Sequence, residues 1–205
     1  MKKLIREAGK RRLKSAVITF DPHPVNVLSP GVKIPMLISL KHRIKLIKSL
    51  GADSCIVVKF TKKFARMNAE DFVKNILVDK FNMKVLVAGG NFLFGFRGKG
   101  CARLLKKLGG IHNFKFYSVA PLKISGNFIS STRIRRLIEK GDLNLAAEML
   151  GRPVTVLGSV VKGKRIGREI GFPTANIDPH HESIPPSGVY SVDVLLDKKL
   201  YRGIL

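Results

Sequence analysis

The first 150 residues alternate between two hydrophobic patterns, one typical of helices and one typical of buried strands. Apolar residues recur at helical spacing in four segments, which we predict to be helices: Met1–Arg12, Leu40–Leu50, Ala69–Phe81 and Cys101–Leu108. Short apolar runs lie between them, and we predict these to be strands: Ser15–Phe20, Cys55–Phe60, Val85–Ala88 and Phe114–Val119. Strands that alternate with helices predict a parallel α/β sheet.

The pattern changes near residue 150. Two more helices are predicted at Ile129–Arg136 and Leu143–Leu150, and Asp142 is a candidate cap for the second. Gly151-Arg152-Pro153 then interrupts the chain, so we expect one domain at 1–150 and another at 151–205. The second domain holds only short β-rich runs with Gly and Pro between them, which predicts a small barrel: Val154–Val161, Phe172–Ile177, Gly188–Leu196 and Leu200–Leu205.

Two irregular loops follow predicted strands of the first domain. Asp21–Pro24 reads D-P-H-P and comes directly after Ser15–Phe20. Gly89–Gly95 reads G-G-N-F-L-F-G and comes directly after Val85–Ala88. Because open parallel sheets bind ligands beyond the carboxyl ends of their strands, we expect a ligand site at these loops.

The segment I-S-S-T-R-I-R-R at Ile129–Arg136 combines hydroxyl groups with positive charge at the start of a helix. Ser130, Ser131 or Thr132 can cap the helix, and its first N–H groups together with Arg133 and Arg135 suit a phosphate. An ordinary capped basic helix without a ligand is the alternative.

The stretch Lys162–Asn176 reads K-G-K-R-I-G-R-E-I-G-F-P-T-A-N and is rich in glycine and basic residues. Glycine stands at every fourth position: Gly163, Gly167 and Gly171. Consecutive backbone N–H groups in such a turn form an anion site, to which Lys164, Arg165 and Arg168 add charge. On a strand, Thr174 and Asn176 would face the same way, as hard-oxygen ligands of Mg²⁺ do. A basic glycine-rich hairpin without a ligand is the alternative.

Composition adds a strong positive charge, formally +24. Such a charge attracts polyanions, and a nucleic-acid-binding protein is therefore one hypothesis. The lysines are spread along the chain without an aromatic-interleaved stripe, so we expect a solvated basic surface instead. Cys55 and Cys101 lie far apart, which is typical of a reducing cytoplasm and not of a structural zinc site. No apolar run has membrane-spanning length.

Four signatures occur here in one order: F-D-P-H-P, G-x-N-F-x-F-G, I-S-S-T-R-I-R and G-x-x-x-G-R-x-x-G-F-P-T-A-N. In this order and spacing the chain resembles the bacterial bifunctional riboflavin kinase/FMN adenylyltransferase (FAD synthetase) family. The resemblance implies an α/β nucleotidyltransferase domain that joins AMP from ATP to FMN. It also implies a riboflavin kinase barrel. Both domains would use ATP and Mg²⁺, with FMN and riboflavin as substrates.

The resemblance also implies roles for individual residues. In the adenylyltransferase domain, Asn91, Ser131, Thr132 and Arg135 would bind ATP and its phosphates. His23 and Phe94 would contact the flavin, although core packing is the alternative for Phe94. In the kinase domain, the ATP loop would be Gly163, Lys164, Gly167, Arg168 and Gly171. Thr174 and Asn176 would hold Mg²⁺, and no residue is assigned as catalytic.

Two departures from the family pattern concern catalysis. The sequence contains no H-x-G-H, whose histidines steady the α-phosphate in the family. We also assign none of its carboxylates as the base of the kinase. By resemblance, the first and central strand of the sheet is missing and the barrel is incomplete. We therefore expect an internal fragment of an FAD synthetase with little or no activity alone. Unpaired strand edges favour a complementing chain that supplies the missing strands. An inactive flavin- or nucleotide-binding remnant is the alternative.

Overall fold

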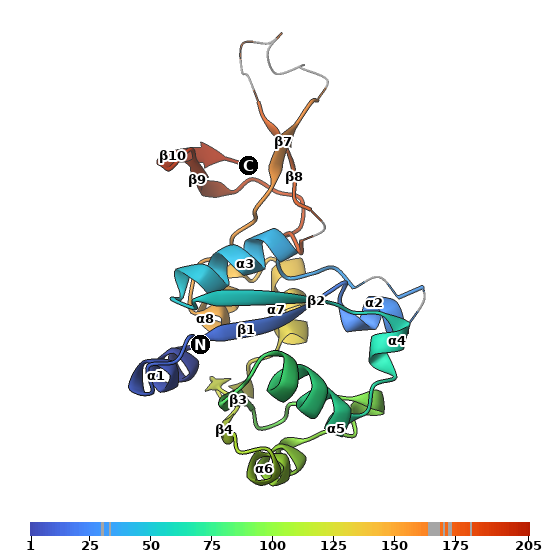
Figure 1. Ribbon diagram of the computed structural model, residues 1–205. Coiled ribbons are helices and arrows are strands. Elements are labelled where there is room, and N and C mark those ends of the chain that lie inside the picture. Colours follow the sequence, from blue (N-terminus) through green and yellow to red (C-terminus); the bar gives the residue numbers. More distant parts are fainter. Residues whose placement is uncertain (30, 33, 164–168, 170, 172–173, 181) are drawn as a thin grey trace. The chain divides into compact units, whose positions relative to one another are not determined.

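The computed structural model describes the chain except for residues 30, 33, 164–168, 170, 172–173 and 181 (Figure 1). The chain divides into two compact units, Met1–Ile129 and Ser130–Leu205. No helix in the described ranges is both long and apolar enough to cross a membrane.

Two pairs of parallel strands form the framework of the first unit (Figure 1). Strand β1 (Ala16–Asp21) pairs with β2 (Ser54–Lys59), and β3 (Val85–Gly89) pairs with β4 (Lys115–Val119). The predicted parallel strands are thus confirmed, but each pair is a separate two-stranded sheet. In the described part of the chain, no strand joins β1 to β3. Each of β1 and β3 therefore has one backbone edge without a hydrogen-bonded partner strand among the described residues.

Helices and short turns connect and cover these strands. They are α1 (Lys2–Lys10), α2 (Pro24–Leu28), α3 (Leu40–Ser49), α4 (Lys62–Ala65), α5 (Ala69–Asp71), η1 (Phe72–Lys80), η2 (Phe96–Gly98) and α6 (Ala102–Ile111). A small hairpin pairs β5 (Lys123–Ile124) with β6 (Asn127–Phe128). The helix expected at 69–81 is present but continues from α5 into a π-helix, η1, which the hydrophobic pattern did not predict.

The core of the first unit lies between η1, α6 and the strands. Eight buried residues form one cluster: Ala69, Phe72, Val73, Leu77, Phe94, Leu105, Leu108 and Phe114. Ile18 of β1 and Leu86 of β3 both pack against this cluster. The two strand pairs therefore share one hydrophobic core even though their backbones are not paired. Burial of this apolar surface is the main stabilising term for the unit.

An ionic cluster around the buried carboxylate of Glu7 links α1 to β4. The Glu7 side chain is only 6% exposed and contacts Lys3 at 2.9 Å as well as Arg11. Arg11 also donates a hydrogen bond of 2.7 Å to the hydroxyl of Tyr117 on β4. The hydrogen bond from Lys3, aided by Arg11, lowers the pKa of Glu7 to about 2. This carboxylate is therefore ionised at neutral pH and holds two cations over the Tyr117 ring.

Among its described residues, the second unit has two helices and two hairpins. These are α7 (Ser131–Glu139), α8 (Leu143–Leu150), the pair β7 (Ser159–Val161) and β8 (Asn176–Asp178), and the pair β9 (Ser191–Leu196) and β10 (Lys199–Ile204). Asp142 caps α8 as predicted, since its side chain accepts from the N–H of Leu145 at 3.2 Å. The barrel is not seen among the described residues. Each hairpin is a separate two-stranded sheet, whereas a barrel closes only when every strand has two partners.

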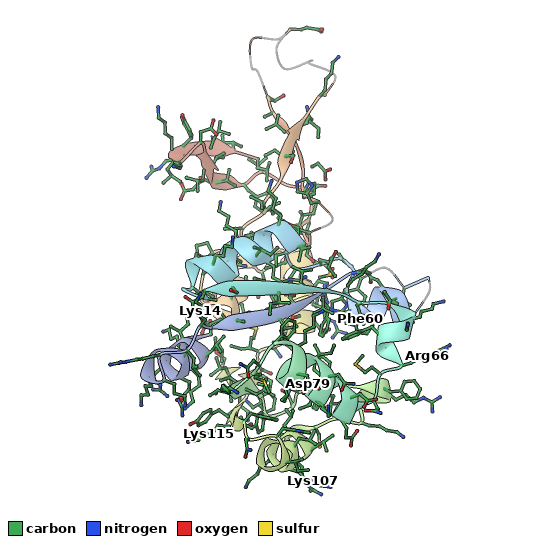
Figure 2. All side chains as sticks on the ribbon, in the orientation of Figure 1. Lys14, Phe60, Arg66, Asp79, Lys107 and Lys115 are labelled. Atoms are coloured by element: carbon green, nitrogen blue, oxygen red, sulfur yellow. The ribbon has the colours of Figure 1, made fainter. Side chains whose placement is uncertain are left out.

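Basic side chains are distributed over many elements of both units. Lys107 of α6 and Lys115 of β4 are exposed examples that Figure 2 labels on the first unit. The basic residues thus lie on separate elements, and the expected solvated basic surface stays a prediction.

Candidate functional site

The D-P-H-P loop begins at the carboxyl end of β1, as the sequence predicts. Asp21 is the last residue of the strand, and its carbonyl accepts a hydrogen bond from the N–H of Phe60 at 3.1 Å. His23 caps α2, because its Nδ1 accepts from the N–H of Val25 at 3.3 Å. The half-buried imidazole therefore has a structural role at the start of a short helix.

The G-G-N loop begins at the carboxyl end of β3. The N–H of Gly90 donates to the carbonyl of Val119 at 2.9 Å, which ties this loop to the end of β4. A Cβ on Gly90 would lie 3.0 Å from Oγ of Ser118, so the backbone passes close to that hydroxyl. Asn91 follows as an exposed residue, with its side chain beside Gly89. The loop thus presents an amide at the position where open parallel sheets bind ligands.

An open pocket of about 530 Å³ borders this loop through Ser118. Its walls come from α6 and β4: Ala102, Arg103, Lys106, Phe116 and Ser118. Two cations, a hydroxyl and an aromatic ring in one pocket suit an anion that carries a flat ring system. At the start of α6, the backbone N–H groups of Leu104 and Arg103 lower the pKa of the Cys101 thiol. The start of α6 is therefore a region of positive potential.

Phe94 belongs to the core of the first unit. Its side chain is 8% exposed, and its ring packs against Phe72 at a centroid distance of 5.9 Å. Phe92 stacks on its other face at 5.4 Å with an angle of 11° between the ring planes. The core-packing alternative is therefore the arrangement observed for Phe94. Phe92, at 36% exposed, is the more accessible ring of this stack.

The helix expected at Ile129–Arg136 is α7, which begins at Ser131 in the second unit. Ser130 is its cap, because the Ser130 hydroxyl accepts from the N–H of Arg133 at 3.2 Å. Ser131 and Thr132 are exposed in the first turn, and Arg135 follows one turn later. The helix start is present where the sequence predicts it, and its role in binding a phosphate stays a prediction.

The glycine-rich stretch connects β7 with β8, and part of it can be described. Val161 pairs directly with Asn176. A Cβ on Gly163 would overlap the Asn176 side-chain amide, so any larger residue there would displace that amide. Gly171 has φ +84°, which also favours glycine. Lys164, Gly167 and Arg168 lie outside the described residues.

The placement of Thr174 differs from the expectation. Thr174 and Asn176 are both exposed, but β8 begins only at Asn176, so Thr174 is not on the strand. The rule that alternate strand residues face the same way therefore does not orient Thr174. The strand is shorter than predicted because only three residue pairs join β7 and β8.

Comparison with known families assigns both parts of the chain. Residues 1–133 match the family model described as FAD synthetase, and residues 150–205 match the model described as riboflavin kinase. The fold of the first unit, with its loops at the carboxyl ends of parallel strands, is of the nucleotidyltransferase class. The chain belongs to the FAD synthetase family, and its C-terminal part is similar to riboflavin kinase domains.

Three bacterial relatives have names that combine both activities. The chain is 36% identical to the bifunctional riboflavin kinase/FMN adenylyltransferase of Buchnera aphidicola subsp. Schizaphis graminum (strain Sg) over 90% of this chain and 60% of that protein. It is 34% identical to that of Escherichia coli K12 (97% and 64% covered). It is 38% identical to that of Listeria monocytogenes (96% and 63% covered). The chain thus spans about three fifths of the length of these relatives.

One solved structure is similar over nearly the whole chain. It is described as a macrolide-efflux protein from Streptococcus pneumoniae. The match covers 99% of this chain and 66% of that protein's chain. The TM-score is 0.82 at 30% sequence identity.

The residues of the open pocket were not found by sequence reasoning. Arg103 and Lys106 lie three residues apart in a basic helix, which is the usual pattern of a solvated face. They line the same pocket as Ser118 only because α6 packs beside β4. The alternation of Phe116 and Ser118 on one face of the predicted strand was the available signal.

Proposed function

We propose that the first part of the chain binds ATP and FMN for adenylyl transfer and that the second binds ATP and riboflavin for phosphoryl transfer. The two domains in this proposal are 1–150 and 151–205, and both act in a cytoplasmic enzyme of FAD biosynthesis. The family assignment supports the reaction types. The observation that carries the adenylyltransferase part is the pocket of Arg103, Lys106 and Ser118 beside the Gly89–Asn91 loop.

Adenylyl transfer needs little covalent chemistry from the protein. A phosphate oxygen of FMN attacks the α-phosphorus of ATP, and pyrophosphate leaves with the electron pair of the broken P–O bond. Positioning and electrostatic stabilisation supply most of the rate enhancement in such reactions. Asn91 would contact the nucleotide, and Ser131, Thr132 and Arg135 would hold its phosphates. Arg103 and Lys106 are suited to a phosphate in the open pocket.

The burial of Phe94 changes which of the two phenylalanines would contact the flavin. Phe94 is buried in the core, so it would support the flavin site from beneath through its stack with Phe92. Phe92 is the ring that a flavin can reach. His23 would shape the neighbouring loop through its cap on α2.

Phosphoryl transfer to riboflavin would take place at the β7–β8 hairpin. The hydroxyl of riboflavin attacks the γ-phosphorus of ATP, and ADP leaves. Gly163, Lys164, Gly167, Arg168 and Gly171 would cover the phosphates, and bound Mg²⁺ would neutralise charge on them. The exposed hydroxyl of Thr174 and amide of Asn176 are hard-oxygen donors that fit this ion. In the described ranges, no cluster of three His, Cys, Asp or Glu side chains could replace them.

A strand from another chain would complete the first unit. The edges of β1 and β3 lack ladder partners among the described residues, while Ile18 and Leu86 of these strands pack on one core. Exposed edges of this kind accept a further strand. The sequence contains no H-x-G-H, so in this proposal the added strand also supplies the histidines for the α-phosphate.

Product analysis by chromatography tests this proposal. The chain, ATP, Mg²⁺ and FMN are expected to form no FAD alone. They should form FAD when a peptide with a hydrophobic strand ending in H-x-G-H is added. Asn91→Ala should reduce this restored activity at least about tenfold. Asn144→Ala, an exposed site on α8, should leave it unchanged. FAD formation without the peptide would show that the histidines are not required.

A further inference from the structure

A serine, a histidine and an aspartate lie together on the β7–β8 hairpin of the second unit, outside the residues assigned above. Oγ of Ser159 is 3.0 Å from Nε2 of His180. Nδ1 of the same imidazole is 3.8 Å from Oδ2 of Asp178. The order hydroxyl, imidazole, carboxylate is that of an activated serine nucleophile.

The register of the hairpin produces this arrangement. Ser159 and Asp178 are direct partners in the antiparallel pair, so their side chains lie on the same face. Beyond the strand, His180 has φ +52°, and its N–H donates to Oδ1 of Asp178 at 2.8 Å. This tight turn carries the imidazole back over the strand end, between the hydroxyl and the carboxylate.

The carboxylate determines how the imidazole can act. A negative charge beside Nδ1 favours a proton on Nδ1, which leaves the lone pair of Nε2 to accept the hydroxyl proton of Ser159. The separation of 3.8 Å between Nδ1 and Oδ2 is longer than a hydrogen bond. It would need to shorten by about 0.6–1 Å to become a hydrogen bond, which is common when a catalytic site binds its substrate.

The group is accessible to a small reactant. Ser159 and Asp178 are exposed, and the His180 side chain is 32% exposed. Asn176 and Asp178 are alternate residues of β8 and therefore share one face of the hairpin. The three side chains thus lie on a hairpin that also carries Asn176, and the proposed phosphoryl transfer does not use them.

We propose that Ser159 is a nucleophile toward activated carboxylic esters, with His180 as its general base and Asp178 as a positioning residue. Oγ bonds to the ester carbonyl carbon while its proton moves to Nε2. The ester C–O bond then breaks, the alcohol or phenol takes the proton, and an acyl-serine remains. Water attacks this acyl-serine and gives its proton to Nε2. The bond between the acyl carbon and Oγ then breaks, Oγ takes the proton back from Nε2, and the carboxylic acid is released. The atoms balance with water as the only co-reactant.

The test uses p-nitrophenyl acetate with the full chain, p-nitrophenolate release by absorbance, and mass spectrometry of the acylated peptide. We expect the acetyl group on Ser159. We also expect release to fall at least about tenfold in Ser159→Ala and in His180→Asn, since general-base help is worth about 10²–10⁴ in rate. Asparagine tolerates the positive φ at residue 180 and removes only the base.

Two further variants separate activation from a structural role. Ser187→Ala changes another exposed serine and should leave the rate unchanged. Asp178→Asn should lower the rate, and Asp178→Glu should restore part of it. Circular dichroism confirms that each variant is folded. Acetyl groups on lysines or His180 but not on Ser159, or equal rates in the wild type and Ser159→Ala, would overturn the proposal.

Discussion

Replacing Phe94 by alanine separates a core role from a ligand-binding role at the centre of the G-x-N-F-x-F-G motif. The ring is 8% exposed and lies between Phe72 and Phe92. It also packs on Gly100, where an added Cβ would lie 2.7 Å from the ring. Removal of a buried phenylalanine ring costs about 3–5 kcal/mol, because transfer and cavity terms add. We expect Phe94→Ala to lower the free energy of unfolding by that amount.

The matching change in melting temperature follows from the size of the unit. The first unit has 129 residues. At about 2.1 cal/mol/K per residue its unfolding entropy is about 0.27 kcal/mol/K. A loss of about 3–5 kcal/mol then lowers Tm by about 11–18 °C. Urea denaturation followed by circular dichroism, together with calorimetry, measures both quantities.

Phe92→Ala is the matched control for this prediction. Its ring is 36% exposed, so we expect a loss of no more than about 1.5 kcal/mol but weaker FMN binding. Gly100→Ala should destabilise by about 1–3 kcal/mol through overpacking, and Phe94→Leu should relieve part of this cost. Equal losses for Phe92→Ala and Phe94→Ala would refute the assignment of Phe94 to the core.

Four other predictions concern single contacts. The folded-state pKa of Glu7, about 2, lies below the ordinary value of 4.5 for a glutamate, so its stabilising effect is present above pH 4.5 and is lost as pH falls through 2. Tm of Glu7→Gln should therefore lie below that of the wild type at pH 7 and approach it near pH 2. Ser130→Ala should cost about 1 kcal/mol of stability in urea denaturation, because it removes the cap of α7. Lys198→Gly should raise stability by about 1 kcal/mol, because Lys198 has φ +67° in the β9–β10 turn, and an unchanged Tm would contradict this. Gly163→Ala should reduce riboflavin phosphorylation as much as Asn176→Ala does, whereas Gly110→Ala, with nothing within 4 Å of its Cβ, should not.

Local signals in the sequence predicted most elements of the first unit. The strands at Ser15–Phe20 and Val85–Ala88 were recognisable because apolar runs of this length fit a buried parallel strand. The positions of the two ligand loops followed from these strands. Asn68 and Ser39 are helix caps of the kind that a local pattern indicates, since each side chain accepts a hydrogen bond from the N–H three residues later.

Features that depend on packing or register could not be predicted. The burial of Phe94 depends on how its loop folds onto η1, and a motif does not show which aromatic residue turns inward. Arg103 and Ser118 meet because α6 packs beside β4. Ser159 and His180 meet because of the β7–β8 register, which a one-residue shift would abolish. The separation of the β1–β2 and β3–β4 pairs is likewise a long-range property.

Isothermal titration calorimetry with ATP·Mg²⁺ and with FMN tests the central claim most directly. We expect saturable heat for both ligands. We also expect at least about tenfold weaker ATP binding in Asn91→Ala and in Arg103→Ala, at about 1.4 kcal/mol per tenfold. Binding in Asn144→Ala should equal that of the wild type. Absence of heat from both ligands, with a folded chain, would contradict the account.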